Sequence, residues 1–379
     1  MALTYYEFFA GGGMARCGLG PDWRCTFAND IDEAKAHAYR ANHGETGLVV
    51  QDVRKLTASD LPGCADLAWA SFPCQDLSLA GGQAGLRGER SGTFWAFWHL
   101  IRNLDREGRG PRVIALENVY GVLTAGGGRD FATIASAFSG RGYRFGAMVI
   151  DAIEYVPQSR PRVFIVGVRK DVPVPMSMLD FGPNRLHPQA VLGTHRHMSK
   201  SALSKWLWWQ LPSPGKRNIG LANLIEENPT GVRWHSQAET SHLLNLMSPR
   251  NRAKVEAMRS LRRRVVGTIY RRTRPDGMGG KAQRAEVRFD DVAGCLRTPA
   301  GGSSRQTILV VEGNVVRSRL ISPREAARLM GLPDEYALPK RYNDAYHLLG
   351  DGVVAPIVGH LATSIIEPLL GAKELRASA

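Results

Sequence analysis

Three short motifs place side chains with catalytic potential next to apolar runs of the sequence. Cys74 follows one such run, and a thiolate just after a strand is well placed to act as a nucleophile. Glu117 ends another run, where partial burial would raise its pKa and suit it to donate a proton. Arg160 and Arg162 precede a third run, and alternating arginines can hold a phosphate and a base oxygen. Each feature alone is more often structural: a buried thiol, a turn residue or a charged face.

A glycine-rich segment follows the first apolar run. Tyr5–Phe9 leads directly into Ala10–Gly13, and glycines after a strand let a ligand approach the backbone closely. A dinucleotide fingerprint would need a third glycine where Arg16 stands, and no phosphate-loop motif occurs, so a nicotinamide enzyme is disfavoured. Asp30 and Asp52 end the next two candidate strands. A carboxylate about twenty residues past the glycines suits a ribose diol, although a helix cap or turn is the alternative for each.

The elements that must position these residues alternate over the first 170 residues. The apolar runs are Tyr5–Phe9, Thr26–Asn29, Asp66–Phe72, Val113–Leu116, Gly146–Ala152 and Val163–Val168. The helical candidates between them are Asp32–Asn42, Gly92–Glu107 and Asp130–Arg141. This rhythm predicts an α/β fold with a mostly parallel sheet and helices on both faces. For Arg160 and Arg162 to reach the same sheet edge, Val163–Val168 must run antiparallel and form a hairpin with Gly146–Ala152.

Regular structure is expected again near the end of the chain. Ser322 with Glu325 three residues later, and Pro323 between them, predicts a capped helix that Gly331 ends. A last apolar helix is expected from Val353 to Leu370. We therefore expect a cofactor-binding domain over residues 1–180, a second irregular domain over 181–338, and a C-terminal helix within 339–379 that returns to the first domain.

The positive charge of the chain is concentrated in one segment. The whole chain carries 49 Lys and Arg residues against 35 Asp and Glu residues, a formal charge of +14. Between Phe181 and Leu320 the counts are 24 and 9, and seven arginines fall between Arg259 and Arg274. A block of one sign beside a near-neutral block fits the binding of a phosphate backbone, with a solvated basic face as the alternative. Tryptophans in the block are expected in the core more often than stacked on bases.

Composition excludes several classes of protein. The chain has 379 residues, 44% of them hydrophobic and 22% charged, which indicates a globular protein with a sizeable core. Its five cysteines form no Cys-x-x-Cys pair, so we expect neither a disulfide framework nor a metal site. No apolar run is long enough for a membrane-spanning helix, and the N-terminus does not resemble a signal peptide. A cytoplasmic protein with a polyanionic partner and no membrane association is expected.

Taken together and in this order, the motifs resemble those of the DNA cytosine-5 methyltransferase family, of the bacterial and phage type. Phe9-Ala10-Gly11-Gly12-Gly13 resembles its S-adenosylmethionine loop, and Pro73-Cys74-Gln75 its nucleophile motif. Glu117-Asn118-Val119 and Gln158-x-Arg160-x-Arg162 match two further motifs. Ser322–Gly331 resembles the helix that supports the recognition domain. Gly350-Asp351-Gly352-Val353 takes the place of the last motif, where the family more often has Gly-Asn-Ser-Val.

The resemblance implies a Rossmann-like methyltransferase sheet with one antiparallel strand, a smaller target-recognition domain in the basic block, and a set of site residues. The implied catalytic residues are Cys74, Glu117, Arg160 and Arg162. The implied contacts to S-adenosyl-L-methionine are Phe9, Ala10, Gly11, Gly13, Asp30, Ile31, Asp52, Val53, Pro73, Asp351 and Val353. The implied contacts to DNA are Gln75, Ser78, Arg90, Arg262, Arg263, Arg264, Arg297, Thr298 and Arg305. The segment 76–91, rich in glycine and arginine, is expected to close over the substrate.

The resemblance further implies methylation of a flipped-out cytosine in double-stranded DNA, with the Cys74 thiolate adding to C6. We expect a monomer, and a cognate restriction endonuclease is a possible partner. Two alternatives remain open. One is methylation of a transfer RNA cytosine, which a large, strongly basic recognition segment disfavours. The other is a non-catalytic DNA-binding protein, which the intact Cys74, Glu117, Arg160 and Arg162 disfavour.

Overall fold

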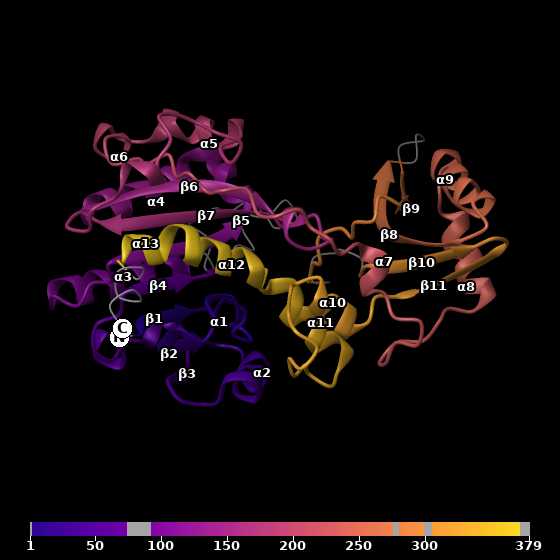
Figure 1. Ribbon diagram of the computed structural model, residues 1–379, viewed down its shortest axis with the longest axis horizontal. Coiled ribbons are helices and arrows are strands. Elements are labelled where there is room, and N and C mark those ends of the chain that lie inside the picture. The colour runs from indigo at the N-terminus through magenta and orange to yellow at the C-terminus, as the bar shows by residue number, and fades with distance from the viewer. Residues whose placement is uncertain (1, 74–91, 276–279, 299–304, 372–379) are drawn as a thin grey trace. The chain divides into compact units, whose positions relative to one another are not determined.

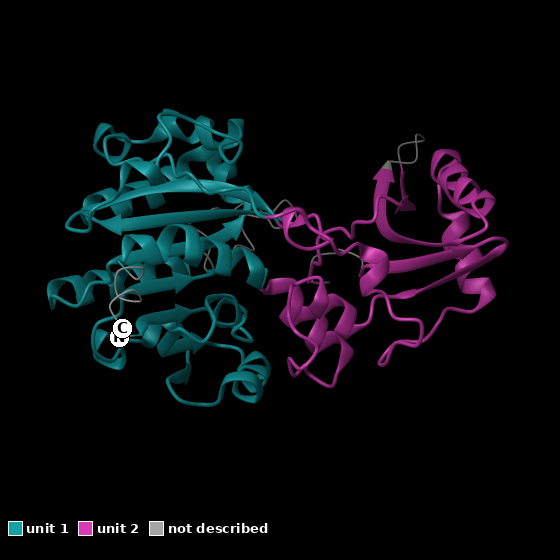
Figure 2. Ribbon diagram, in the orientation of Figure 1, with its two compact units in different colours: residues 1–151, 161–214, 353–379 teal, residues 152–160, 215–352 magenta. Residues whose placement is uncertain are grey.

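The computed structural model describes residues 2–73, 92–275, 280–298 and 305–371, and these residues divide into two compact units (Figure 2). Unit 1 comprises residues 1–151, 161–214 and 353–379, and unit 2 comprises residues 152–160 and 215–352. Residues 181–214, which the sequence analysis placed in the second domain, group with unit 1, and residues 339–352 group with unit 2.

Unit 1 is built on a seven-stranded sheet with the strand order β3-β2-β1-β4-β5-β7-β6 (Figure 1). The strands are β1 (Leu3–Phe8), β2 (Trp23–Asp30), β3 (Leu48–Val50), β4 (Leu67–Ala70), β5 (Val113–Val119), β6 (Tyr143–Asp151) and β7 (Pro161–Arg169). The pairs from β3 to β5 are parallel, and β7 is antiparallel to both β5 and β6. The predicted parallel sheet with one antiparallel strand is confirmed. The strand order reverses between β1 and β4, so the glycine-rich segment after β1 lies at a topological switch point, where ligands bind in sheets of this kind.

Helices cover both faces of this sheet. They are α1 (Met14–Leu19), α2 (Glu33–His43), α3 (Gly92–Arg106), α4 (Arg129–Gly140), α5 (Gln189–Thr194), α6 (Lys200–Leu203), α12 (Ala355–Leu361) and α13 (Glu367–Leu369), with a π-helical turn over Ala362–Ile366. On one face, Phe94, Phe97 and Ile101 of α3 pack with Phe8 and Leu116 in the main core. On the other face, α1 crosses α12 so closely that a Cβ on Gly18 would lie 2.4 Å from Ala355 O. Glycine at this position permits the contact.

The segment that follows β7 joins unit 1 because it pairs with the edge strand β6. Phe145 N donates to Lys205 O (2.9 Å) and Leu207 N donates to Phe145 O (2.7 Å). Trp209 is fully buried and its indole N–H donates to Val166 O (3.1 Å). A Cβ on Gly146 would lie 2.0 Å from Leu207 O, so glycine is needed for this approach. The expected core role of Trp209 is confirmed, and base stacking is excluded for it.

Unit 2 contains a four-stranded antiparallel sheet with the order β11-β10-β8-β9. Its elements are α7 (Leu221–Leu224), α8 (Gln237–Asn245), α9 (Pro249–Ser260), β8 (Arg264–Pro275), β9 (Lys281–Arg288), β10 (Thr307–Glu312), β11 (Val315–Leu320), α10 (Pro323–Arg328) and α11 (Tyr342–Asp351). Its small core includes Leu243, Val255, Ile269 and Leu309. The sheet was not predicted, because β8 and β9 carry arginines and one lysine at exposed positions, which hides the alternation.

The predicted helix start at Ser322 is confirmed. The Ser322 hydroxyl accepts from Glu325 N (3.1 Å), and the Glu325 carboxylate accepts from Ser322 N (2.8 Å). Glu325 also forms an ion pair with Arg319 in which both side chains are fully buried. The chain from Tyr342 to Leu369 is long and apolar enough to cross a membrane, but 61% of its most apolar window is buried inside the protein. Such burial is typical of a core helix.

Candidate active site

The glycine-rich segment after β1 is held by the carboxylate of Asp30. Phe9, Gly11 and Gly13 all have left-handed backbone angles, with φ of 57°, 55° and 77°. Gly11 N donates to Asp30 Oδ2 (2.7 Å), and Asp32 N donates to Asp30 Oδ1 (2.9 Å). The left-handed angle at a non-glycine residue such as Phe9 costs roughly 1 kcal/mol, so the surrounding contacts must fix this turn. The predicted cofactor residues Phe9, Gly11 and Gly13 therefore lie in one backbone turn, and Asp30 holds this turn by a hydrogen bond.

A set of polar groups behind this turn, one buried and two half-buried, was not predicted. His43 Nε2 lies 3.1 Å from Gly13 O, and burial with the nearby Arg16 guanidinium lowers the pKa of His43 to about 4. Because a carbonyl only accepts, the neutral imidazole donates to it from Nε2. Glu7 is buried beside them, and burial raises its pKa to about 8. The signal in the sequence was a single carboxylate within the apolar strand Tyr5–Phe9.

Three further predicted cofactor residues, Ile31, Asp52 and Val53, lie near the ends of β2 and β3. Asp52 forms a bidentate ion pair with Arg54, whose hydrogen bonds hold the pKa of Asp52 below its ordinary value. Val53 is buried, whereas Ile31 is 67% exposed. Carboxylates can accept hydrogen bonds from the ribose diol and the amino group of a nucleoside ligand, and an exposed apolar side chain can cover the face of its base. The left-handed glycine turn lets such a ligand approach the backbone closely. These residues fit S-adenosylmethionine.

The candidate catalytic groups lie where β4, β5 and β7 meet. Arg162 Nε lies 3.2 Å from Glu117 Oε1, and 14% and 8% of the two side chains are exposed. Arg162 pairs with Val119 across the strands, so its side chain reaches Glu117 diagonally on the same face. The Asn118 amide donates to Phe72 O (3.3 Å), which ties β5 to the segment that leads to Pro73. Cys74, Gln75, Ser78 and Arg90 lie outside the described residues.

Arg160 is placed differently from Arg162. It is 1% exposed, and its guanidinium donates to the carbonyls of Leu296 (2.8 Å), Gly350 (2.7 Å) and Gly352 (2.7 Å). A guanidinium with these partners joins two backbone segments of unit 2. This placement favours a positioning role for Arg160, which the sequence analysis had grouped with the catalytic residues.

Gln158 is a further structural residue of the same motif. It is fully buried, its Oε1 accepts from Leu296 N (3.0 Å), and its amide donates to Leu329 O (2.7 Å). It therefore connects the chain that bears Arg297 and Thr298 to the end of α10. Gln158 was recognised as part of a motif but not as a site residue, because its partners are backbone atoms far away in the sequence.

The last motif and the recognition residues are partly bound to one another. Thr298 donates its hydroxyl hydrogen to the Asp351 carboxylate, so predicted DNA and cofactor contacts are partners. Val353 is buried and Arg297 is exposed. Arg305 lies over the Tyr342 ring, with 5.6 Å between guanidinium carbon and ring centroid, and donates to Asn343. Arg305 is thus held by α11 rather than extended from the surface.

Three adjacent predicted DNA contacts lie at the junction between α9 and β8. Arg262 and Arg263 are exposed and Arg264, the first residue of β8, is half-buried. Arg262 has a left-handed φ of 48°, which turns the chain sharply after α9. Both exposed cations are accessible to a polyanion.

Comparison with known proteins gives a consistent result. The family model of the C-5 cytosine-specific DNA methylase matches residues 3–367. The Type II methyltransferase M.HhaI of Haemophilus parahaemolyticus is 24% identical over 370 residues, covering 96% of this chain and 94% of that protein. The Type II methyltransferase M.BsuFI of Bacillus subtilis is 25% identical, covering 97% and 73%.

Solved structures share the fold. The S. pombe Dnmt2 methyltransferase has a TM-score of 0.59 at 15% identity, covering 97% of this chain and 99% of that chain. The Entamoeba histolytica methyltransferase EhMeth has a TM-score of 0.64 at 14% identity, with the same coverage. The predicted family resemblance, fold class and enzyme class, a DNA cytosine-5 methyltransferase, are confirmed. With motifs, sheet topology and a family match over nearly its whole length, the chain belongs to the C-5 cytosine-specific DNA methylase family.

Proposed function

We propose that this protein methylates C5 of a cytosine within a specific sequence of double-stranded DNA, and that the target base is flipped out of the duplex. Family membership supports the reaction class. The observation that carries the assignment of residues is the junction of β4, β5 and β7. There Glu117 and Arg162 are paired, and Asn118 holds the carbonyl of Phe72, two residues before Cys74.

The methyl donor proposed is S-adenosyl-L-methionine, held by the glycine turn, Asp30, Ile31 and Asp52. When bound, it supplies an electrophilic methyl group. Asp30 already accepts two backbone N–H groups, and each carboxylate oxygen retains a lone pair for a ribose hydroxyl. Asp52 must share its oxygens with Arg54 or release that side chain. Phe9, Ala10, Val53, Pro73 and Val353 are proposed to shape the rest of this site.

The chemistry proposed for the protein side chains begins with attack on the pyrimidine ring. The Cys74 thiolate adds to C6 while the Glu117 carboxyl gives a proton to N3, which makes C5 nucleophilic. Arg162 fixes the orientation of Glu117 and donates to the base oxygen. After methylation, a base takes the C5 proton, the Cys74 sulfur leaves C6 with the electron pair of its bond, and the N3 proton returns to Glu117, which restores the aromatic ring. Arg160 holds the surrounding backbone and takes no part in proton transfer.

Two assays test the proposal. Purified protein with tritiated S-adenosylmethionine should label duplex DNA, and sequencing of DNA from an expressing host should show 5-methylcytosine at one sequence. DNA that contains 5-fluorocytosine should form a covalent adduct, because fluorine at C5 cannot leave as a proton does. Labelling of transfer RNA instead of DNA would overturn the proposed substrate, and labelling without an adduct would overturn the covalent route.

The cellular setting is also a proposal. Relatives with the name Type II methyltransferase support a role in restriction and modification, and hence a cognate endonuclease and a cytoplasmic location. A monomer is proposed because the proposed chemistry needs only one chain. If host DNA resists cleavage by one restriction enzyme only when this protein is expressed, the recognition sequence of that enzyme is the sequence expected for the cognate endonuclease. Light scattering after size-exclusion chromatography measures the oligomeric state.

A further inference from the structure

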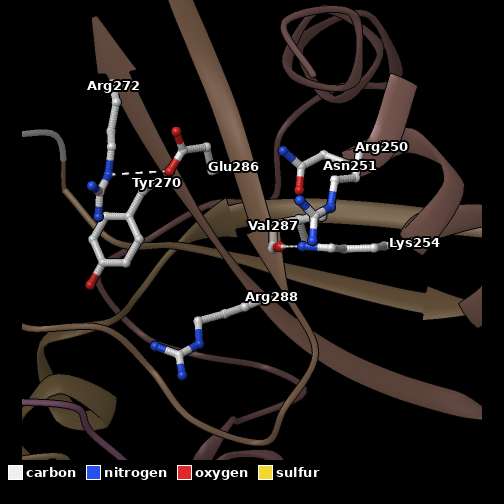
Figure 3. Close-up of a pocket in the computed structure, with 8 residues that line it drawn as sticks. All are labelled: Arg250, Asn251, Lys254, Tyr270, Arg272, Glu286, Val287 and Arg288. Carbon is white, nitrogen blue, oxygen red and sulfur yellow. Dashed lines mark hydrogen bonds and ion pairs between the residues drawn. The ribbon is translucent and has the colours of Figure 1, made fainter. Parts of the chain in front are cut away.

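A pocket of about 320 Å³ in unit 2 contains none of the individual DNA contacts predicted from the sequence, although Arg272 belongs to the arginine-rich stretch Arg259–Arg274 (Figure 3). It lies between α9 and the strands β8 and β9. Its lining residues are Arg250, Asn251, Lys254, Tyr270, Arg272, Glu286, Val287 and Arg288. Four are cations and one is a carboxylate, and Asp290 beside the pocket pairs with Arg288. The pocket still has a net positive charge and suits an anion.

Most of these cations are already held in place. Lys254 Nζ donates to Val287 O (3.1 Å), and Arg272 lies 5.8 Å from the centroid of the Tyr270 ring. Glu286 forms ion pairs with Arg272 and also with Arg274, next to the pocket. A site whose long side chains are fixed before binding loses less conformational entropy when an anion arrives.

The two cations on α9 are the least neutralised. Arg250 and Lys254 are four residues apart, about 40° around the helix axis, so both face the pocket. The Arg250 side chain makes no hydrogen bond or ion pair with any of the described residues, and it is exposed. The only carboxylate of α9, Glu256, is paired with Arg259. An anion in the pocket would relieve the repulsion between Arg250 and Lys254.

The wall of the pocket is joined to a segment expected to contact DNA. The Tyr270 hydroxyl donates to Cys295 O (3.3 Å), two residues before Arg297. A Cβ on Gly294 would lie 1.8 Å from the Tyr270 hydroxyl oxygen, so glycine lets the ring pack there. A polyanion bound along Arg297 and Thr298 would therefore pass the same wall of unit 2.

The geometry points to a binding site for one backbone phosphate of duplex DNA between α9 and β9, with Arg250 and Lys254 as its principal ligands and Arg272 and Arg288 beside them. The inference rests on the proposed function for its polyanion. It adds a contact that is independent of base sequence, because a phosphate carries no base information.

The test measures binding of a fluorescein-labelled 30-base-pair duplex of random sequence by anisotropy at several salt concentrations. The double variant Arg250→Gln with Lys254→Gln should bind about fivefold more weakly at 0.15 M salt. The slope of log affinity against log salt should become about 0.9 shallower, the value for one phosphate that the protein no longer neutralises. A slope equal to that of the unmodified protein would overturn the inference.

The matched control is Arg252→Gln, which removes a charge from the same helix. Arg252 is exposed, does not line the pocket, and lies about 160° around the helix from Arg250. The salt slope of the Arg252→Gln variant should equal that of the unmodified protein. If this variant flattens the slope as much as the double variant does, the effect comes from the overall charge of the helix and the inference of a phosphate site is wrong. Binding of S-adenosylmethionine and the melting temperature verify folding.

The same preparation separates this inference from the proposed function. If the unmodified protein transfers no methyl group but the double variant still has a flatter salt slope than the unmodified protein, the proposed function is wrong and the phosphate site is supported. Transfer RNA that binds tenfold more tightly than the duplex, and is weakened equally by the double variant, would assign the pocket to RNA and overturn the DNA phosphate.

Discussion

The two units use charge in opposite ways. Unit 1 has 24 Lys and Arg residues against 20 Asp and Glu residues, whereas unit 2 has 25 against 15. At the sheet edge of unit 1, the carboxylates proposed for the site have fixed partners: Arg162 for Glu117 and backbone N–H groups for Asp30. In unit 2, Arg250, Arg262 and Arg263 are exposed to solvent. Chemistry on a substrate needs charges fixed in place, whereas attraction of a polyanion needs exposed ones.

The comparison also corrects the distribution of charge inferred from the sequence. Residues 181–214 contain four cations and no carboxylate, and they belong to unit 1 because they pair with β6. Residues 321–352, which do belong to unit 2, carry −1, so the excess of unit 2 is +10 rather than the +15 of the segment Phe181–Leu320. A count along the chain cannot recognise a segment that folds back.

The largest expected effect separates chemistry from binding. Cys74→Ser should lower methyl transfer by about 10⁴-fold or more, because an alcohol is far less ionised than a thiol at neutral pH. Binding to duplex DNA, measured by anisotropy, should remain within twofold. Full activity of this variant would remove Cys74 from the mechanism.

The next effect tests the fixed carboxyl of unit 1. Glu117→Gln should lower kcat by about 10²–10³-fold, because an amide cannot supply a proton to the base. KM for DNA and the salt dependence of binding should hardly change, since Glu117 is paired inside unit 1. If the Glu117→Gln variant has an altered salt slope and a normal kcat, Glu117 contributes to DNA binding and not to the chemical step. Single-turnover methyl transfer provides the measurement.

A buried cation of unit 2 should behave unlike the exposed ones. Arg160→Ala should lower the free energy of unfolding by about 3 kcal/mol, because several backbone carbonyls lose their donor. Arg233→Ala, which removes an exposed ion pair with Glu239, is the control and should change stability little. Urea denaturation compares the two. Equal losses would mean that the hydrogen bonds of Arg160 do not stabilise unit 2.

The buried carboxyl of Glu7 gives unit 1 a pH dependence. Its pKa is raised to about 8, so its contribution to stability is full below the unfolded value and is lost as the pH rises through 8. The free energy of unfolding of the Glu7→Gln variant, relative to that of the unmodified protein, should therefore rise by about 3 kcal/mol when the pH is raised from 5 to 8. Thermal melting at both pH values measures this difference. A difference that does not vary with pH would show that Glu7 is ionised in the folded state.

The smallest effect per residue belongs to the three arginines at the junction between α9 and β8, two of which are exposed and one half-buried. Replacement of Arg262, Arg263 and Arg264 by Gln should flatten the salt slope by about 0.9, and weaken binding about fivefold at 0.15 M salt, for each phosphate that these side chains neutralise. Affinity for S-adenosylmethionine should be unchanged. An unchanged slope would mean that these side chains face away from DNA. Isothermal titration and anisotropy provide the two measurements.

Local patterns predicted the elements of unit 1 well. The runs that contain Tyr5–Phe9 and Val113–Leu116 became β1 and β5, because buried parallel strands are continuous apolar runs. The antiparallel direction of β7 followed from the requirement that its leading arginines reach the shared edge, and it is confirmed. The sheet of unit 2 was not predicted, because β8 and β9 carry charged residues at their exposed positions and their local pattern resembles a loop.

By itself, the sequence determined the family, the reaction class and the local turns, because these depend on residue type and short spacing. The capping box at Ser322 and the glycine turn after β1 are of this kind. The partners that lie far apart in the chain were decided only by the tertiary structure. Arg160 and Arg162 are two residues apart, yet one binds carbonyls of residues 296, 350 and 352 and the other binds Glu117. The energy of a buried guanidinium depends on which acceptors the fold brings to it, and spacing along a strand does not specify them.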